Sequence, residues 1–340
     1  MRALLLRTLL LLAVVLAAVA AWFGWHYQQF LHTPLAIPAD GVSVEVSRGT
    51  GLRQVSDDLA VRGLLASPEL LVLYGRLNGL DTGIKAGEYL LEPGLTPPAL
   101  LAQISSGRVV QYALTLVEGW TFHQALAAVR ADPVLRRTLD PEADDDALMA
   151  ALGRPGLHPE GRLFPSTYHF PRGTSDVEFL RRALEQMEQV LQQAWAQRAE
   201  GLPFADPYEA LVLASIVEKE SALAEERPLI AGVFVRRLER GMRLQADPTV
   251  IYGLGSGFDG DLRRRDLRTD GPYNSYTRHG LPPTPIALPG AGSIEAVLHP
   301  AAGQALYFVA RGDGSHEFSA TLAEHSAAVR RYQLGGKDKR

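Results

Sequence analysis

The chain has 340 residues, of which 46% are hydrophobic and 21% are charged, a composition typical of a globular protein large enough for two modest cores. The formal net charge is -4 and the basic residues are spread along the chain, which disfavours nucleic acid as a partner. The sequence contains no cysteine, so disulfides, thiolate metal ligands and a cysteine nucleophile are excluded.

An uncharged apolar run, Thr8–Trp25, follows the basic residues Arg2 and Arg7 near the N-terminus. The run is long enough to cross a bilayer as one helix, and its basic flank predicts a cytoplasmic N-terminus with the remaining chain outside, in the periplasm if the cell has two membranes. Aromatic residues typical of the outer interface end the run: Trp22, Phe23, Trp25 and Tyr27. A cleaved signal peptide is the alternative, because residues 18–20 (A-V-A) resemble a cleavage site. We favour a retained single-pass anchor over residues 1–27, because the run exceeds a usual signal core.

After a linker at residues 28–41, the segment 42–110 alternates strand-like and helix-like patterns. In chain order these patterns are V-S-V-E-V, L-R-Q-V-S-D-D-L-A-V-R-G-L-L, P-E-L-L-V-L-Y-G-R-L-N-G-L and A-G-E-Y-L-L-E-P-G. They predict a small strand-helix-helix-strand unit. Further along, a long helix is expected at about 177–198.

The nine residues 214–222, A-S-I-V-E-K-E-S-A, end a predicted helix and carry the most informative side chains of the chain. Asp206 fits an N-cap, Pro207 fits the first turn, and Glu209 fits the partner in a capping box. We therefore expect the helix to run from near Pro207 to about Ser221.

Glu220 lies on the apolar face of this helix, where an ionised carboxylate is least stable. The same face carries, three and four residues apart, Leu213, Ile216 and Val217. Burial among them disfavours the charged form, which raises the carboxyl pKa and makes Glu220 a candidate general acid. A structural ion pair between Glu220 and an arginine is the alternative. Glu218 projects from another side of the helix, and we expect it to be a supporting or surface group.

A second helix is predicted at about 226–240, and three segments after it combine aromatic, amide and carboxyl side chains with rigid turns. They read R-L-Q-A-D-P-T-V-I-Y-G at residues 243–253, P-Y-N-S-Y-T at 272–277 and G-L-P-P-T-P-I at 280–286. In the first segment the polar groups stand beside apolar residues that favour a strand. Aromatic faces stack on sugar rings, while amides and carboxylates bind hydroxyls, so these segments fit a glycan cleft and equally fit ordinary turns and core.

Taken together, A-S-I-V-E-K-E-S and the three segments after it resemble the MltG (YceG-like) family of membrane-anchored endolytic murein transglycosylases. The resemblance covers nearly the whole chain outside the membrane. It implies an α+β fold with an N-terminal transmembrane helix and a small LysM-like domain over residues 42–110. A mixed α/β catalytic domain, residues 111–340, then contains the helix that carries the catalytic glutamate.

This resemblance implies cleavage, without water, of the β-1,4 bond between N-acetylmuramic acid (MurNAc) and N-acetylglucosamine (GlcNAc) in nascent peptidoglycan. The products have 1,6-anhydromuramoyl ends, as expected of a carbon–oxygen lyase acting on polysaccharide, and cleavage terminates glycan elongation. Glu220 is then the catalytic acid, which protonates the glycosidic oxygen and afterwards takes the proton of the muramoyl C6 hydroxyl. Other residues match motif positions and are expected to line or support the glycan cleft: Gln245, Asp247, Tyr252, Asn274 and Tyr276.

Two other functions stay open on the sequence. A hydrolytic muramidase needs a second carboxylate as base or nucleophile, for which Glu218, Glu226 and Asp247 are available. A noncatalytic peptidoglycan-binding or assembly protein would use the LysM-like segment and keep Glu220 as a structural group.

We expect no cofactor and no metal. The nine histidines lack zinc-ligand spacing, and the acidic run 140–152 favours a helix start because it lacks the spacing of an EF-hand. The glycine-rich segment 253–257 lacks the dinucleotide fingerprint, and Lys219 lacks the context of a pyridoxal-phosphate lysine. The expected partners are peptidoglycan glycan strands, the membrane and, by resemblance alone, membrane peptidoglycan polymerases. We place the chain in the inner membrane with its catalytic domain in the periplasm.

Overall fold

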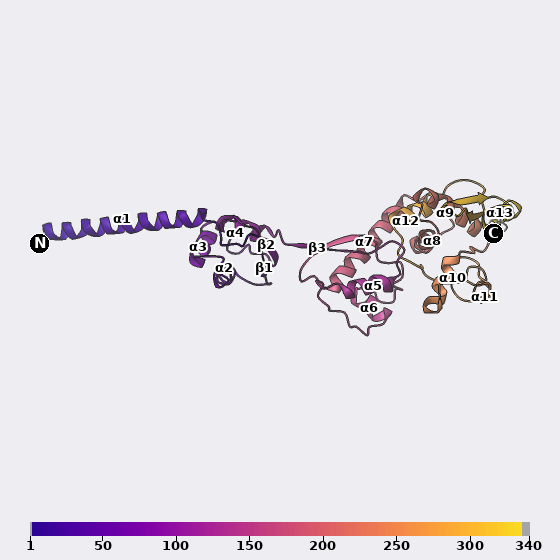
Figure 1. Cartoon of the computed structure of the whole chain (residues 1–340), viewed down its shortest axis with the longest axis horizontal. Coiled ribbons are helices and arrows are strands. Elements are labelled where there is room, and N and C mark those ends of the chain that lie inside the picture. The colour runs from indigo at the N-terminus through magenta and orange to yellow at the C-terminus, as the bar shows by residue number, and fades with distance from the viewer. Residues whose placement is uncertain (1, 335–340) are drawn as a thin grey trace. The chain divides into compact units, whose positions relative to one another are not determined.

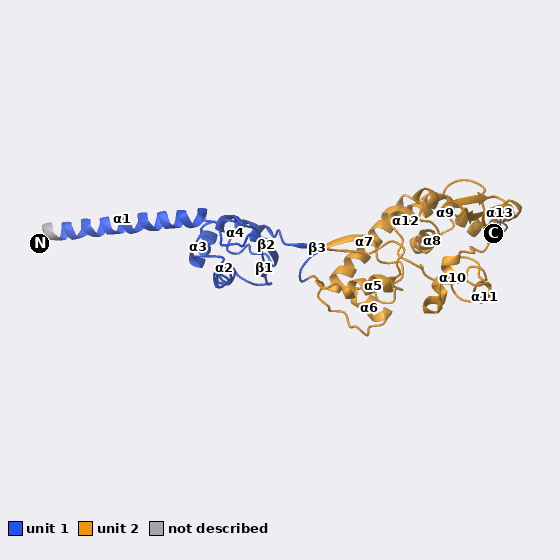
Figure 2. Cartoon of the chain, viewed as in Figure 1, with its two compact units in different colours: residues 1–112, 170–173 blue, residues 113–169, 174–340 orange. Residues whose placement is uncertain are grey.

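A computed structural model describes residues 2–334 of the chain, with side chains from Leu5 onward. The chain divides into two compact units (Figures 1 and 2). Unit 1 comprises residues 1–112 and 170–173, and unit 2 comprises residues 113–169 and 174–340. Both units combine helices with short strands, so the predicted α+β class is confirmed.

Unit 1 begins with α1 (Arg2–His32), a long apolar helix. Its 28-residue segment Leu5–His32 contains an 18-residue stretch with a mean hydropathy of 2.3, and this stretch is not buried against other parts of the protein. At about 1.5 Å per residue this segment is about 42 Å long, which exceeds the hydrocarbon core of a bilayer, about 30 Å thick. The helix is therefore consistent with a single-pass anchor or a signal sequence. It continues past Tyr27 into the residues that we expected to begin the linker.

The rest of unit 1 folds in the order predicted for residues 42–110. The elements are β1 (Val42–Val46), α2 (Leu52–Val61), α3 (Pro68–Leu77), β2 (Gly87–Leu91) and a further helix, α4 (Pro97–Ser106). β1 and β2 pair in antiparallel fashion, with Val44 opposite Tyr89. Both of these side chains are buried in one hydrophobic core with residues of α2, α3 and α4, because alternate residues of a strand face the same side.

Unit 2 contains the elements from β3 onward, except for the first two residues of β3 and the last two of β4, which belong to unit 1. The first are β3 (Gln111–Thr115), α5 (Phe122–Ala131), α6 (Asp145–Ala151), β4 (Thr167–Pro171), which pairs with β3, and α7 (Asp176–Ala196). Then come α8 (Pro207–Glu220), η1 (Ala224–Glu226), α9 (Arg227–Glu239), α10 (Asp247–Leu254), η2 (Gly255–Gly257), α11 (Arg264–Arg268) and α12 (Ala291–Leu298). The last are β5 (Tyr307–Ala310) and β6 (His316–Ser319), which pair in antiparallel fashion, α13 (Leu322–Val329) and η3 (Arg330–Leu334). The helices predicted at 177–198, 207–221 and 226–240 are present as α7, α8 and α9.

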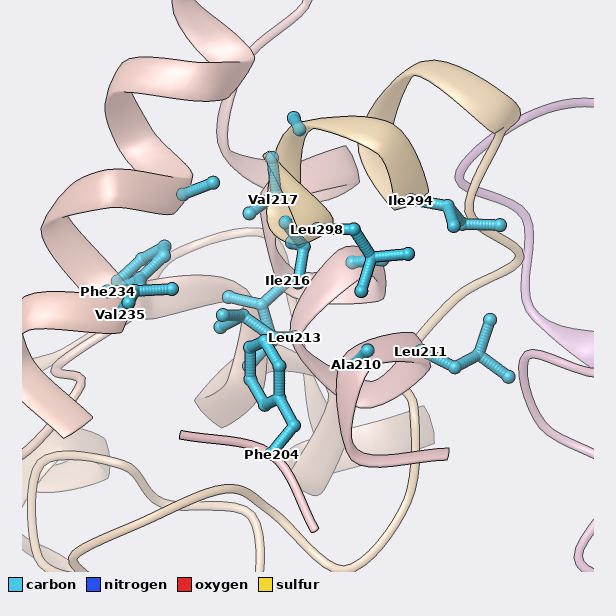
Figure 3. Close-up of a cluster of buried hydrophobic side chains, with 14 of the residues drawn as sticks. Phe204, Ala210, Leu211, Leu213, Ile216, Val217, Phe234, Val235, Ile294 and Leu298 are labelled. Atoms are coloured by element: carbon cyan, nitrogen blue, oxygen red, sulfur yellow. The ribbon is translucent and has the colours of Figure 1, made fainter. Parts of the chain in front are cut away.

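α8 occupies the centre of the hydrophobic core of unit 2 (Figure 3). Every residue from Ala210 to Val217 is buried, and the helix packs in one cluster with Phe234 of α9 and Leu298 of α12. A helix that is apolar all round is a buried helix. The face that carries Leu213, Ile216 and Val217 is buried as expected, and the other sides of α8 from Ala210 to Val217 are buried as well.

The segment 247–254 is a helix, α10, and not the strand that its apolar residues favoured. Asp247 lies in the first turn and Pro248 at the start, where an acidic residue and a proline both suit a helix. Thr249 and Val250 are buried against the rest of unit 2. Tertiary packing and the start signals therefore override strand propensity in this segment.

Candidate active site

The last three residues of α8, Glu218, Lys219 and Glu220, lie in three different surroundings. The start of the helix is fixed by Asp206, whose carboxylate accepts a hydrogen bond from the Glu209 amide at 3.0 Å. Consecutive residues of a helix point about 100° apart, so Lys219 points away from both glutamates. Glu218 and Glu220 themselves point about 160° apart, to nearly opposite sides of α8. The position of each side chain follows from this rotation.

Glu218 is a buried structural carboxylate whose side chain is 4% exposed. It accepts hydrogen bonds from the Gly290 amide at 2.9 Å and the Ser293 hydroxyl at 2.7 Å, both at the start of α12. Its other oxygen accepts a hydrogen bond from the Arg227 guanidinium at 3.1 Å. Glu218 thus ties the end of α8 to α9 and α12. Of the two locations that we considered for it, the supporting one fits and the surface one does not.

Glu220 lies in a cavity of about 530 Å³, which we call the acid cavity. Its lining comes from the end of α8, the start of α10, α9, the β5–β6 hairpin and α13, and includes Arg237, Gln245, Asp247, Tyr276, Tyr307, His316 and His325. The pKa of Glu220 is raised to about 8, mainly by burial and in addition by the charge of Asp247, while the charge of Arg237 opposes the rise. A carboxyl group with this pKa holds its proton at neutral pH and can donate it to a bound molecule.

Asp247 gives the acid cavity a second carboxyl group. One of its oxygens accepts a hydrogen bond from the Tyr276 hydroxyl at 2.5 Å, which fixes the carboxyl group at the start of α10. Burial raises the pKa of Tyr276, and the bond to Asp247 raises it further, so this hydroxyl keeps its proton and remains a donor. Both residues were expected at the glycan cleft, and the structure brings them together with Glu220.

The backbone around Gln245 and Asn274 shapes one wall of this cavity. Among residues 2–334, Gln245 is the one non-glycine residue with a positive φ, at 51°, and its amide donates to the Ser275 carbonyl at 3.1 Å. Such a conformation costs about 1 kcal/mol or more and points to a functional constraint on the side chain that it directs into the cavity. Asn274 is buried: its amide group donates to two backbone carbonyls, and its oxygen accepts from the Tyr276 amide at 2.9 Å. Asn274 therefore supports Tyr276 and does not line the cavity.

Glu226 is buried behind the acid cavity and holds His316. Its two oxygens accept from the His316 amide at 2.8 Å and pair with the ring Nδ1 at 2.6 Å. Burial pushes the pKa of Glu226 upward, but the hydrogen bonds from His316 outweigh it, and the pKa lies below its usual range. Glu226 thus has a supporting position, and the residue that reaches the cavity is His316.

Arg237 of α9 is a buried guanidinium in the wall of the acid cavity. It donates to the carbonyls of Leu306 at 2.7 Å and Leu244 at 2.6 Å, and it lies 5.2 Å from the centre of the Tyr307 ring. Burial lowers its pKa. Its charge nevertheless opposes the rise in the Glu220 pKa.

Tyr252 does not reach the acid cavity and lines a separate one. Its hydroxyl donates to a Glu160 oxygen at 3.0 Å, and both residues line a neighbouring cavity of about 710 Å³. The residues expected at one cleft are therefore divided between two cavities. Gln245, Asp247 and Tyr276 share the acid cavity with Glu220, while Tyr252 faces the other.

Four further residues line the acid cavity and were not predicted from the sequence: Arg237, Tyr307, His316 and His325. The pair Asp313-Gly314 between two apolar stretches is a hairpin signal that predicts the β5–β6 hairpin, and with it the position of His316 at the start of a strand. Arg237 follows another arginine in α9 and carries no comparable signal, because only tertiary packing turns it inward.

Similarities to known proteins cover most of the chain. The sequence matches the model of the YceG-like family over residues 44–331. It is 30% identical over 307 residues to the endolytic murein transglycosylase of Bacillus subtilis, and the aligned region covers 86% of this chain and 84% of that protein. It is 29% identical to the endolytic murein transglycosylase of Streptococcus pneumoniae, over 88% of this chain and 60% of that protein. The structure is similar to the crystal structure of a yceG-like protein from Listeria monocytogenes, with a TM-score of 0.54, 28% identity and coverage of 85% of this chain and 99% of that chain.

Proposed function

The chain belongs to the YceG-like family, and from this membership we propose that it is a membrane-anchored endolytic lytic transglycosylase. Its substrate is the β-1,4 bond between MurNAc and GlcNAc in peptidoglycan strands. The observation that carries the proposal is the Glu220 carboxyl group, which lies in the acid cavity with a pKa raised to about 8. A group with this pKa can give a proton at neutral pH and take one back.

One carboxyl group serves both halves of the reaction. Glu220 donates its proton to the glycosidic oxygen as the bond from that oxygen to MurNAc C1 breaks, and GlcNAc leaves with a free hydroxyl. The C6 hydroxyl of MurNAc then attacks C1, and its proton passes to the Glu220 carboxylate. The product has a 1,6-anhydro ring, and Glu220 is again protonated for the next cycle.

Asp247 stabilises the positive charge that develops on the sugar ring between these steps. Its carboxyl group lines the same cavity as Glu220 and is positioned by the Tyr276 hydroxyl. A fixed charge that faces a developing opposite charge lowers the barrier without reorganisation of solvent. At a pH low enough to keep Glu220 protonated in both proteins, Asp247→Asn therefore tests this role while the proton donor remains in place.

The Asp247 carboxyl group also favours one alternative function, that of a hydrolytic muramidase. Hydrolysis usually employs a second carboxylate, and Asp247 is the one that shares the acid cavity with Glu220. Mass spectrometry of the products separates the reactions, because a hydrolysed MurNAc end is heavier than an anhydro end by one water molecule.

The remaining parts of the chain set the location of cleavage. α1 anchors the chain in the inner membrane with the N-terminus in the cytoplasm and unit 2 in the periplasm. Residues 42–110 form a LysM-like domain that adds affinity for glycan, and residues 111–340 form the catalytic domain. Because the anchor keeps cleavage near the bilayer, the substrate is the nascent strand, the partners are membrane peptidoglycan polymerases, and cleavage terminates elongation.

The test uses full-length protein in detergent micelles with defined, uncrosslinked glycan strands. The natural sequence should generate anhydro ends, Glu220→Gln should generate none, and Glu225→Gln should behave as the natural sequence does, because Glu225 is an exposed carboxylate beyond the end of α8. Hydrolysed ends would identify a muramidase. An absence of cleavage by the natural sequence would identify a noncatalytic protein.

A further inference from the structure

The cavity of about 710 Å³ that Tyr252 lines lies directly beside the acid cavity, and we call it the second cavity. Consecutive residues line the two: Glu220 and Asp247 face the acid cavity, while Lys219 and Pro248 face the second cavity. Adjacent Cα atoms are only about 3.8 Å apart. A substrate held in the acid cavity can therefore extend into its neighbour over a short distance.

The second cavity is mostly apolar, and the hydroxyl groups of the two tyrosines that line it are hydrogen-bonded to other side chains of the protein. Its apolar lining consists of Pro248, Ile251, Ile286 and the rings of Tyr252 and Tyr273. The Tyr252 hydroxyl donates to Glu160 at 3.0 Å, and the Tyr273 hydroxyl is bonded to the Thr284 hydroxyl at 2.8 Å. The two rings pack edge to face, with centroids 4.9 Å apart. This wall therefore offers contact area and few polar atoms to a ligand.

Residues at the start of α5 also line the second cavity, and the polar groups of Thr121 and Gln124 are engaged within the protein. Thr121 and Gln124 form a capping box in which each side chain accepts a hydrogen bond from the other residue's amide. Glu160 accepts from the Phe122 amide at 2.9 Å and the Gly161 amide at 3.3 Å. Its carboxyl group therefore fastens α5 to α10 through Tyr252.

Lys219 supplies a positive charge at the rim of this apolar cavity. Its ammonium group donates one hydrogen bond to the Gly119 carbonyl at 3.1 Å, and an ammonium group has three N–H donors. Two donors therefore remain for a ligand. His123 lies at the same rim, 3.7 Å from Asp145. An apolar lining with a cation at its edge fits a ligand with methyl groups and a carboxylate better than a sugar, whose hydroxyls need many polar partners.

We propose that the second cavity binds the peptide stem of MurNAc, with Lys219 contacting a stem carboxylate. The inference rests on the proposed function, because it takes peptidoglycan as the substrate. Stem residues carry alanine methyl groups and free carboxylates, and the stem begins at the lactyl group of the sugar that is cleaved. Roughly four extended residues span about 13 Å, which is enough to pass from one cavity into the other. The enzyme therefore prefers glycan strands that still bear their stems.

The test compares two substrates on full-length protein: uncrosslinked strands with stems, and the same strands after an amidase has removed the stems. The natural sequence should cleave stem-bearing strands about tenfold faster, and Lys219→Gln should reduce this ratio of rates about three- to tenfold, the effect of one hydrogen bond of ordinary strength. The matched control is Arg137→Gln, an exposed cation of unit 2 that lines neither cavity, and it should leave the ratio unchanged.

Equal rates of the natural sequence on both substrates, or faster cleavage of stem-free strands, would overturn the inference. A Lys219→Gln variant that slows both substrates equally would also overturn it. Calorimetric measurement of the binding of a free stem tetrapeptide distinguishes a failure of the stem-binding proposal from a failure of the proposed function. Binding that Lys219→Gln weakens supports the second cavity even where no strand is cleaved, a result that would refute the proposed function alone.

Discussion

Glu220→Gln should abolish strand cleavage and, at alkaline pH, stabilise the protein. The pKa of Glu220 is raised from 4.5 to about 8, mainly by burial. Between these two values the native protein holds a proton that the unfolded protein has lost, so the free energy of unfolding falls by about 1.4 kcal/mol per pH unit. The stabilising contribution of Glu220 is fully present below the unfolded pKa and is lost as the pH rises through about 8. The whole loss is at most about 5 kcal/mol.

Urea denaturation near pH 5 and near pH 9 measures this difference. Near pH 5 the natural sequence and Glu220→Gln should have similar free energies of unfolding, and near pH 9 the variant should be more stable by about 2 to 5 kcal/mol. The Glu225→Gln control, at an exposed carboxylate, should show no such trend. In the same pH range, kcat/KM of the natural sequence should decline as the acid form of Glu220 disappears. A Glu220→Gln variant that instead loses stability relative to the natural sequence as the pH rises would identify an ion-paired structural carboxylate and refute the reasoning.

Asp247→Asn removes the charge that helps to raise the Glu220 pKa, so the alkaline limb of kcat/KM should move to lower pH and the rate should fall about tenfold or more; an unmoved limb would contradict this. Glu226→Gln weakens the hydrogen bonds to His316 and should lower the free energy of unfolding by about 1 to 3 kcal/mol in urea titrations, whereas an effect as small as that of Glu225→Gln would argue against a supporting role. The protein should stay in the membrane fraction after alkaline extraction, and a soluble mature form that begins near Ala21 would rule out the anchor. Deletion of residues 42–110 should weaken sedimentation with purified peptidoglycan while the product stays an anhydro sugar, so unchanged binding with a hydrolysed product would disprove the assigned role.

Local patterns in the sequence were sufficient to predict the start of α8 and the order of the elements in residues 42–110. Asp206 and Pro207 mark the start of α8, and the Asp206 side chain does accept the capping hydrogen bond. The alternating and helical patterns of residues 42–110 likewise predict the order of β1, α2, α3 and β2. The helical rotation that separates Glu218 from Glu220 also predicts that the two carboxyl groups have different surroundings, which the structure shows.

The features of the site that the sequence did not predict depend on packing between elements far apart in the chain. The partners of Glu218 lie on α9 and at the start of α12, and no spacing within α8 indicates them. Tyr252 faces the second cavity while Asp247 faces the first, and the other residues that line the two cavities come from elements far apart in the chain, which no local pattern indicates. His316 reaches the acid cavity because the β5–β6 hairpin packs beside α9, and this contact joins residues far apart in the chain.

The end of α8 has a consequence for how this protein can vary during evolution. Lys219 and Glu220 each face their own cavity only because the number of residues between the cap at Asp206 and the end of α8 is fixed. One inserted or deleted residue between the cap and the end would rotate the last turn by about 100° and direct the wrong side chain into each cavity. The buried residues 210–217 would lose their packing at the same time. Changes in α8 are therefore restricted to substitutions, while differences in length among relatives should collect in the exposed loops between other elements.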